Sequence, residues 1–168
     1  YQFLADKVFD KPQVYQDALK KYDDRLAEVR DNITVPAGES SFISMLADGR
    51  PFVLVEDRGL PAEFKELGFR PAPLFASGDY QPYVPGGDSF ELSTEQVGQV
   101  LTMPTLFIIG FQTQTQTVDE LRKRPIFGQL PAFTGNQVYE LPYESMRGDH
   151  NDALKTLDIV ERNFGDKK

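Results

Sequence analysis

The stretch Leu92-Ser-Thr-Glu-Gln-Val-Gly-Gln-Val-Leu-Thr-Met-Pro-Thr-Leu-Phe-Ile-Ile-Gly110 decides the fold class. Ser93 is a typical N-cap residue, so a short helix is expected to begin there and to end before Pro104. Residues 105–110 are apolar on both faces, which is typical of a strand buried in a parallel sheet. A helix followed by such a strand predicts an α/β layered domain.

The chain that follows this strand continues to alternate between helices and strands. A helix is expected over 118–124, a strand over 137–141, and a last helix that runs to Phe164 and stops at Gly165. The repeated Gln-Thr pattern of 112–117 comes directly after the buried strand. Ligands of open α/β sheets bind at the carboxyl ends of strands, so this loop is a candidate site. The composition of this loop is equally well explained by a polar surface loop that has no functional role.

On the amino-terminal side, residues 12–31 give the clearest helical pattern. Pro12 suits the first helical position, and charged residues occupy the face opposite the apolar one. The apolar positions recur at spacings of three and four: Val14, Ala18, Tyr22, Leu26 and Val29.

The next segment predicts a hairpin and a short helix. Strand-like runs at 41–46 and 51–56 are joined by a tight turn at Asp48-Gly49. A short helix is expected over 61–67, and the Pro- and Gly-rich residues 71–90 are expected to form a long loop. The predicted class is therefore α/β, with a central, mostly parallel sheet between two helical layers.

Composition excludes several classes of protein. The 168 residues carry 18 basic and 26 acidic side chains, a net charge of −8, which argues against nucleic-acid binding. No apolar run reaches the length of a membrane span. The chain has no Cys and one His, so thiolate sites, disulfides and most zinc chemistry are excluded.

No enzyme motif stands out in this sequence. His150 accompanies no recognisable nucleophile motif, and its neighbour Asp149 is better explained as a helix cap. Glu56, Asp57 and His150 are the acid–base candidates if the chain is a small α/β enzyme. From the residues alone, the interpretation stops at an α/β lobe that binds a ligand.

A family resemblance is carried by the order and spacing of three segments. They are residues 92–110, Pro125-Ile-Phe-Gly-Gln-Leu-Pro-Ala-Phe-Thr-Gly-Asn-Gln-Val-Tyr139 and Ala153-Leu-Lys-Thr-Leu-Asp158. They resemble the carboxyl-terminal lobe of substrate-binding proteins of ABC importers for iron–siderophore complexes, haem and cobalamin. Thr105 departs from the family pattern, which usually has Asp after the proline.

The resemblance implies a layout and a location. Residues 1–31 resemble the end of the long helix that joins two lobes, and 32–168 resemble the carboxyl-terminal lobe. The chain lacks an initiator Met, and we expect it to be a fragment whose amino-terminal lobe, signal sequence and lipid anchor are absent. The implied protein is extracytoplasmic, attached to the membrane only through that anchor, monomeric, and not an enzyme.

The resemblance also implies that the ligand is a ferric siderophore and that no further cofactor is needed. Its iron arrives already coordinated by the chelator, so no direct protein–metal bonds are expected. Loops 56–58, 111–113 and 143–147 are expected on the cleft side of the lobe. Arginine satisfies anionic oxygens, and aromatic rings give flat apolar contact. The predicted ligand-binding residues are Arg58, Arg147, Tyr80, Tyr83, Phe111 and Gln112.

Two matters stay open at this point. Glu95 is expected to dock onto arginines of the membrane permease, although an acid at a helix start is also explained by the helix dipole. Haem or cobalamin is the alternative ligand, and haem would use His150, Tyr80, Tyr83 or Tyr143 as an axial group. The chelator class is not determined by these residues.

Overall fold

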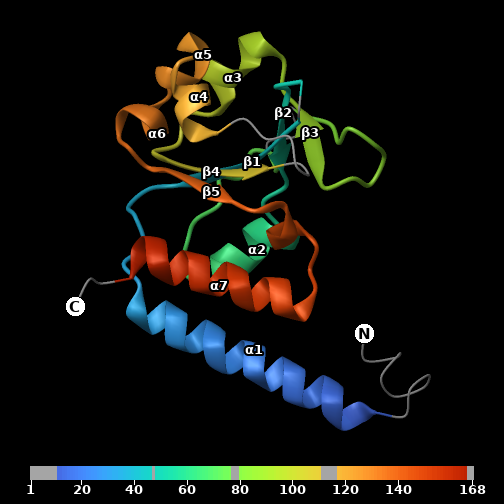
Figure 1. Cartoon of the computed structure of the whole chain (residues 1–168). Helices are drawn as coiled ribbons and strands as arrows, with labels where there is room; N and C mark the ends of the chain where they lie inside the picture. The colour runs from blue at the N-terminus through green and yellow to red at the C-terminus, as the bar shows by residue number, and fades with distance from the viewer. Residues whose placement is uncertain (1–10, 47, 77–79, 111–116, 166–168) are drawn as a thin grey trace. The chain divides into compact units, whose positions relative to one another are not determined.

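The structure is a computed structural model, which describes residues 11–46, 48–76, 80–110 and 117–165 (Figure 1). The chain divides into two compact units. One unit spans 35–147, and the other joins the residues up to 34 with those from 148 onward.

The larger unit is built on a mixed five-stranded sheet with the order β3-β2-β1-β4-β5. Strands β1, β4 and β5 are mutually parallel, while β2 is antiparallel to β1 and β3 is antiparallel to β2. The strands are β1 (Ser40–Met45), β2 (Pro51–Leu54), β3 (Ser89–Glu91), β4 (Thr105–Gly110) and β5 (Val138–Leu141). The helices of this unit are α2 (Gly59–Glu66), α3 (Thr94–Val100), α4 (Val118–Arg122), α5 (Pro125–Gly128), α6 (Pro131–Thr134) and the 3₁₀ turn η2 (Tyr143–Met146).

One face of the sheet is covered by α3, α4, α5 and α6 (Figure 1). The side chains of Ile43, Val53 and Ile108 lie on this face and are at most 1% exposed. They belong to one apolar core together with helix residues such as Leu121 and Phe133. The alternation of strand side chains between the two faces explains why every second residue of β1 and β4 joins this core.

The opposite face of the sheet carries a cluster of aromatic side chains, to which α2 contributes Phe64. The rings of Phe42 and Phe107, on neighbouring strands, stack with centroids 4.7 Å apart. Phe64 of α2 packs edge-on against both, at 5.1 and 4.7 Å. Both faces of β4 are therefore buried, as its apolar run predicts, and the α/β three-layer prediction is confirmed.

The smaller unit consists of α1 (Pro12–Asn32) packed on α7 (His150–Phe164). The chain after α1 also bonds to the end of α7, because the Thr34 N–H donates to the Phe164 carbonyl at 2.9 Å. Burial along α1 is uneven. Val29 is fully buried, whereas Val14 is 62% exposed, so the expected apolar stripe is covered only near its carboxyl end.

The expected helix caps and turns are present. The Ser93 N–H donates to the Gln96 side chain at 2.9 Å, and Asp149 accepts the N–H groups of Asn151 and Asp152 at 3.0 Å. Gly49 in the hairpin turn has φ +83°, and Gly68 after α2 has φ +96°. Few residues other than glycine adopt these values, which is why both turns end their elements where the sequence indicates. The loop expected over 71–90 ends in a strand, β3, that the sequence analysis did not predict.

Candidate functional site

Strand direction decides which loops share an edge of the sheet. Since β1, β4 and β5 are parallel, the segments that follow them leave from one edge, called here the carboxyl edge. The β1–β2 turn and the end of β3 lie at the same edge, because Met45 pairs with both Pro51 and Gly110, and Phe52 pairs with Glu91. The opposite edge, where β1, β4 and β5 begin, is called the amino edge.

Arg50 is the best-defined cation of the carboxyl edge, and it was missed by the sequence analysis. Its guanidinium donates from Nε to Asp48 at 2.7 Å and from Nη1 to Glu91 at 2.8 Å. It lies 6.0 Å from the ring centroid of Phe52, within the range of a cation–π contact. The hydrogen bond from Arg50 lowers the pKa of Asp48, and the two carboxylates raise the pKa of Arg50.

A signal for Arg50 was present in the sequence. The Asp48-Gly49 turn predicts a hairpin, and a hairpin turn lies at the carboxyl end of its first strand. If that first strand is parallel to 105–110, the turn and the loop after Gly110 share an edge. Arg50 follows from this reasoning without any structure.

Tyr80 and Tyr83 are not brought together. The ring of Tyr80 stacks on Phe90 with centroids 4.5 Å apart, and Phe90 belongs to the core under α3. The ring of Tyr83 packs edge-on against Phe52 at 5.1 Å. Phe90 and Phe52 lie on opposite faces of the sheet, since Phe90 pairs with Val53. Tyr80 therefore fixes the loop to the core, while Tyr83, 62% exposed, is the accessible ring beside Phe52.

The segment after β5 carries the next predicted residue. Arg147 is exposed and follows η2, with its N–H bonded to the Glu144 carbonyl at 3.0 Å. It therefore comes after a parallel strand, as expected for the carboxyl edge. Phe111 and Gln112, which directly follow β4, lie outside the described residues.

Arg58 lies at the other edge, and the expectation that it shares an edge with 111–113 and 147 is wrong. It follows β2, which is antiparallel to β1, so its segment leaves the sheet at the amino edge. There it immediately precedes α2 and donates from Nε to Asp57 at 3.1 Å. Contact of Arg58 with a ligand stays a prediction.

The acid–base candidates have local partners. The two carboxylate oxygens of Glu56 accept the N–H groups of Phe75 and Ala76, at 3.1 and 2.9 Å, which holds the 73–76 turn in place. His150 is the first residue of α7, directly after the capping residue Asp149. In the described part of the chain, no group of His, Cys, Asp and Glu is arranged to hold a metal ion.

Glu95 lies at the amino-terminal end of α3 and is exposed. Hydrogen bonds from its own backbone N–H and from Ser93 lower its pKa, so the carboxylate stays ionised at neutral pH. A hollow of about 480 Å³ adjoins it, and its lining is mostly apolar apart from the side chains of Glu95 and Gln129. The other lining residues are Gly98, Pro125, Ile126, Leu130 and Pro131.

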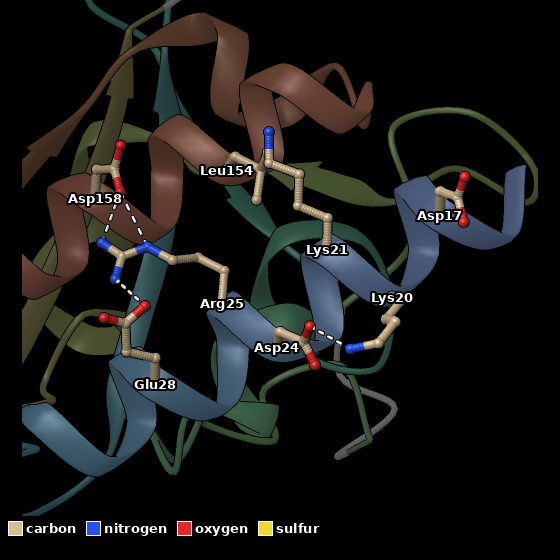
Figure 2. Close-up of a pocket in the computed structure, with 8 residues that line it drawn as sticks. All are labelled: Asp17, Lys20, Lys21, Asp24, Arg25, Glu28, Leu154 and Asp158. Carbon is tan, nitrogen blue, oxygen red and sulfur yellow. Dashed lines mark hydrogen bonds and ion pairs between the residues drawn. The ribbon is translucent and has the colours of Figure 1, made fainter. Parts of the chain in front are cut away.

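A second hollow, of about 570 Å³, lies between α1 and α7 in the smaller unit, and its walls are mostly charged (Figure 2). Arg25 donates to Glu28 at 2.9 Å and to Asp158 and Glu161 at 2.7 Å each. Hydrogen bonds to Glu161, Asp158 and Glu28 raise the pKa of Arg25, and the hydrogen bonds that Glu161 accepts from Arg25 and Asn32 lower the pKa of Glu161. Because Arg25 is already bonded to three carboxylates, these ion pairs are best explained as contacts that hold α1 and α7 together.

No helix among the described residues is both long and apolar enough to cross a bilayer.

Comparisons with known proteins were made for sequence and for structure. No model of a known protein family matches the chain. The chain is 27% identical over 151 residues to the ferric enterobactin-binding periplasmic protein FepB of Escherichia coli O6:H1 (strain CFT073). That match covers 87% of this chain and 46% of FepB, so the chain spans about half the length of the relative.

Solved structures share the fold. Holo-ViuP superposes with a TM-score of 0.75 at 20% identity, over 92% of this chain and 51% of ViuP. SirA of Staphylococcus aureus, complexed with staphyloferrin B, superposes with a TM-score of 0.67 at 20% identity, over 95% of this chain and 58% of SirA. At these identities the structures establish the fold of a lobe.

The comparisons confirm the resemblance to siderophore-binding proteins of ABC importers. The relatives are substrate-binding transport proteins rather than enzymes, so the alternative of a small α/β enzyme is set aside. FepB is named as a periplasmic protein.

Proposed function

Because the chain is similar to siderophore-binding periplasmic proteins and has the fold of one of their lobes, we propose that it is one lobe of a protein that captures an iron–siderophore complex and delivers it to an ABC-transporter permease. The observation that carries the proposal is the similarity to FepB along 87% of the chain. FepB is named for ferric enterobactin and the SirA structure holds staphyloferrin B, so the fold leaves the siderophore open.

In this proposal, residues 1–31 are the end of the helix that joins two lobes, and 32–168 are the carboxyl-terminal lobe. The uneven burial of α1 supports it. Val14 is 62% exposed and Leu19 is 43% exposed, whereas Val29 is fully buried. Exposed apolar residues on the amino-terminal half of α1 are expected if that half packs against another part of the intact protein.

The ligand would be held at the carboxyl edge, where strand ends of an α/β sheet commonly bind ligands. Arg147 supplies an exposed guanidinium and Tyr83 an exposed ring. Arg50 and Phe52 extend this wall toward β3. Phe111 and Gln112 are kept as ligand contacts because they follow β4 in sequence. The ligand would bind between this lobe and a second one, so we expect weak binding by the chain alone.

The test is a calorimetric titration of the intact protein that contains this chain. The titrants are a panel of ferric siderophores, haem and cobalamin. We expect saturable binding of at least one ferric siderophore and no turnover of it. Binding of haem or cobalamin alone would contradict the siderophore assignment, and turnover of any of these compounds would contradict a binding role.

Glu95 is proposed to dock onto a cation of the permease. An ionised, exposed carboxylate beside a largely apolar hollow offers a charge contact together with a surface for apolar side chains. We expect Glu95→Gln to lower siderophore uptake by cells while ligand affinity stays unchanged. Glu66→Gln, which removes an exposed acid of α2, is the matched control. Unchanged uptake in the Glu95 variant would refute the docking role. Attachment through an amino-terminal anchor and a monomeric state stay predictions.

A further inference from the structure

The charge of the described carboxyl edge bears on which ferric complex the lobe takes. The described residues of the β1–β2 turn, the end of β3 and the segment 142–147 include two cations, Arg50 and Arg147. They also include three acids: Asp48, Glu91 and Glu144. Two minus three gives a net charge of −1 for these described residues.

The charge of Arg50 is balanced within the protein. Asp48 and Glu91 accept its hydrogen bonds at 2.7 and 2.8 Å. An anionic ligand would have to displace one of these carboxylates or bind beside them, and like charges close together oppose binding. Lowering of the Asp48 pKa by Arg50 keeps that carboxylate ionised at neutral pH.

The same surface offers aromatic contact. Phe52 lies beneath the Arg50 guanidinium, and the exposed Tyr83 ring meets Phe52 edge-on. Rings give flat apolar contact, and the Tyr hydroxyl adds a neutral hydrogen bond. Such a wall favours a ligand whose oxygens need hydrogen bonds rather than opposite charges.

We propose that the ferric complex taken by this lobe is electrically neutral, as in a ferric trihydroxamate, rather than a trianion such as a ferric tris-catecholate. The inference rests on the proposed function and narrows it to one charge class. Three hydroxamates together bring three negative charges and neutralise the ferric ion, whereas three catecholates bring six and leave a net charge of −3. The balanced Arg50 and the net acidity of the described edge are the grounds for the choice.

The experiment titrates the intact protein with ferrichrome, a neutral trihydroxamate, and with ferric enterobactin, a trianionic tris-catecholate. The readout is calorimetry at physiological ionic strength. We expect ferrichrome to bind at least about tenfold more tightly. Equal or tighter binding of ferric enterobactin overturns the charge inference and leaves the proposed function standing. Binding of neither complex, nor of any other siderophore of the panel, overturns the proposed function itself.

A double variant tests whether Arg50 and its carboxylates set this preference. Asp48→Asn with Glu91→Gln leaves Arg50 unbalanced, and we expect the affinity ratio to move about tenfold toward the trianion. Asp17→Asn with Asp24→Asn, on α1, changes the net charge equally and is expected to move the ratio less than about twofold.

An equal response of the two double variants, or none in either, overturns the assignment to Arg50. Asp48 also accepts the N–H of Arg50 at 3.1 Å and so supports the turn. Glu91→Gln alone is therefore the second variant, to be used if thermal melting indicates that the double variant is unfolded.

Discussion

The two edges of the sheet carry similar polar residues and use them differently. At the amino edge, polar groups are bonded to one another or to backbone: Thr105 donates to Gln137 at 3.0 Å, and Glu56 accepts two backbone N–H groups. At the carboxyl edge, Arg50 and its two carboxylates are all at least 32% exposed. The exposed pair of Arg58 and Asp57 also lies at the amino edge, so the difference teaches that strand direction decides which exposed cations share an edge, Arg50 with Arg147 and not with Arg58.

The largest expected effect comes from a substitution in the apolar core that supports both edges of the sheet. Phe107 is fully buried in the centre of β4 and contacts four other rings: Phe42, Phe64, Phe69 and Tyr139. We expect Phe107→Ala to lower the free energy of unfolding by about 3–5 kcal/mol, through lost burial and the cavity left behind. Urea denaturation measures it. Val84→Ala, at a 53% exposed site, is the control, and a similar loss there would contradict the account.

Glu56 tests the structural role of the amino edge. Glu56→Ala removes the acceptor of two N–H groups, so we expect a loss of about 2 kcal/mol of stability. Ligand affinity is expected to change less than about twofold. Glu66→Ala on the exposed side of α2 should cost less than about 0.5 kcal/mol. A Glu56 variant of normal stability that has lost ligand affinity would reverse the roles of the two edges.

The two arginines compare the edges directly. We expect Arg147→Ala to weaken binding of the ferric ligand about tenfold, or about 1.4 kcal/mol, because it removes guanidinium N–H donors for the ligand's oxygens from the carboxyl edge. Arg58→Ala, at the amino edge, should change the affinity less than about twofold. Calorimetry on the intact protein gives both values. The opposite order of effects would show that the ligand approaches the other edge.

The smallest expected effect is a difference in how the stability of the protein depends on pH. Burial, with the nearby charge of Glu66, raises the pKa of Glu63 on α2 to about 7. A carboxyl whose pKa is raised on folding stabilises the protein below its unfolded pKa, near 4.5, and this stability is lost as pH rises toward 7. Asp48 has a lowered pKa, so its contribution is lost only under acid conditions.

We therefore expect Glu63→Gln to stabilise the protein by about 1 kcal/mol more at pH 8 than at pH 5, a value reduced for partial exposure. Thermal melts at the two pH values measure it. Asp48→Asn should give no such difference over this interval, and an equal pH dependence in both variants would contradict the assignment.

Much of the fold followed from local patterns in the sequence. Ser93, the Asp48-Gly49 turn and Gly68 act over a few residues, so their caps and turns could be identified without the rest of the chain. The apolar run of β4 indicated burial on both faces for the same reason. The alternation of helices and strands in that half of the chain also indicated that Arg147 follows a strand, which the structure shows to be parallel to β4, while its contact with a ligand stays a prediction.

Tertiary structure alone decided what depends on distant partners. The ion pair between Arg50 and Glu91 joins residues 41 positions apart and exists only because β3 pairs with β2. Arg58 was assigned to the wrong edge because the sequence pattern of a strand is the same in either direction, whereas its neighbours set that direction. Local chemistry thus determined the elements of this protein, and long-range pairing determined which of their ends meet.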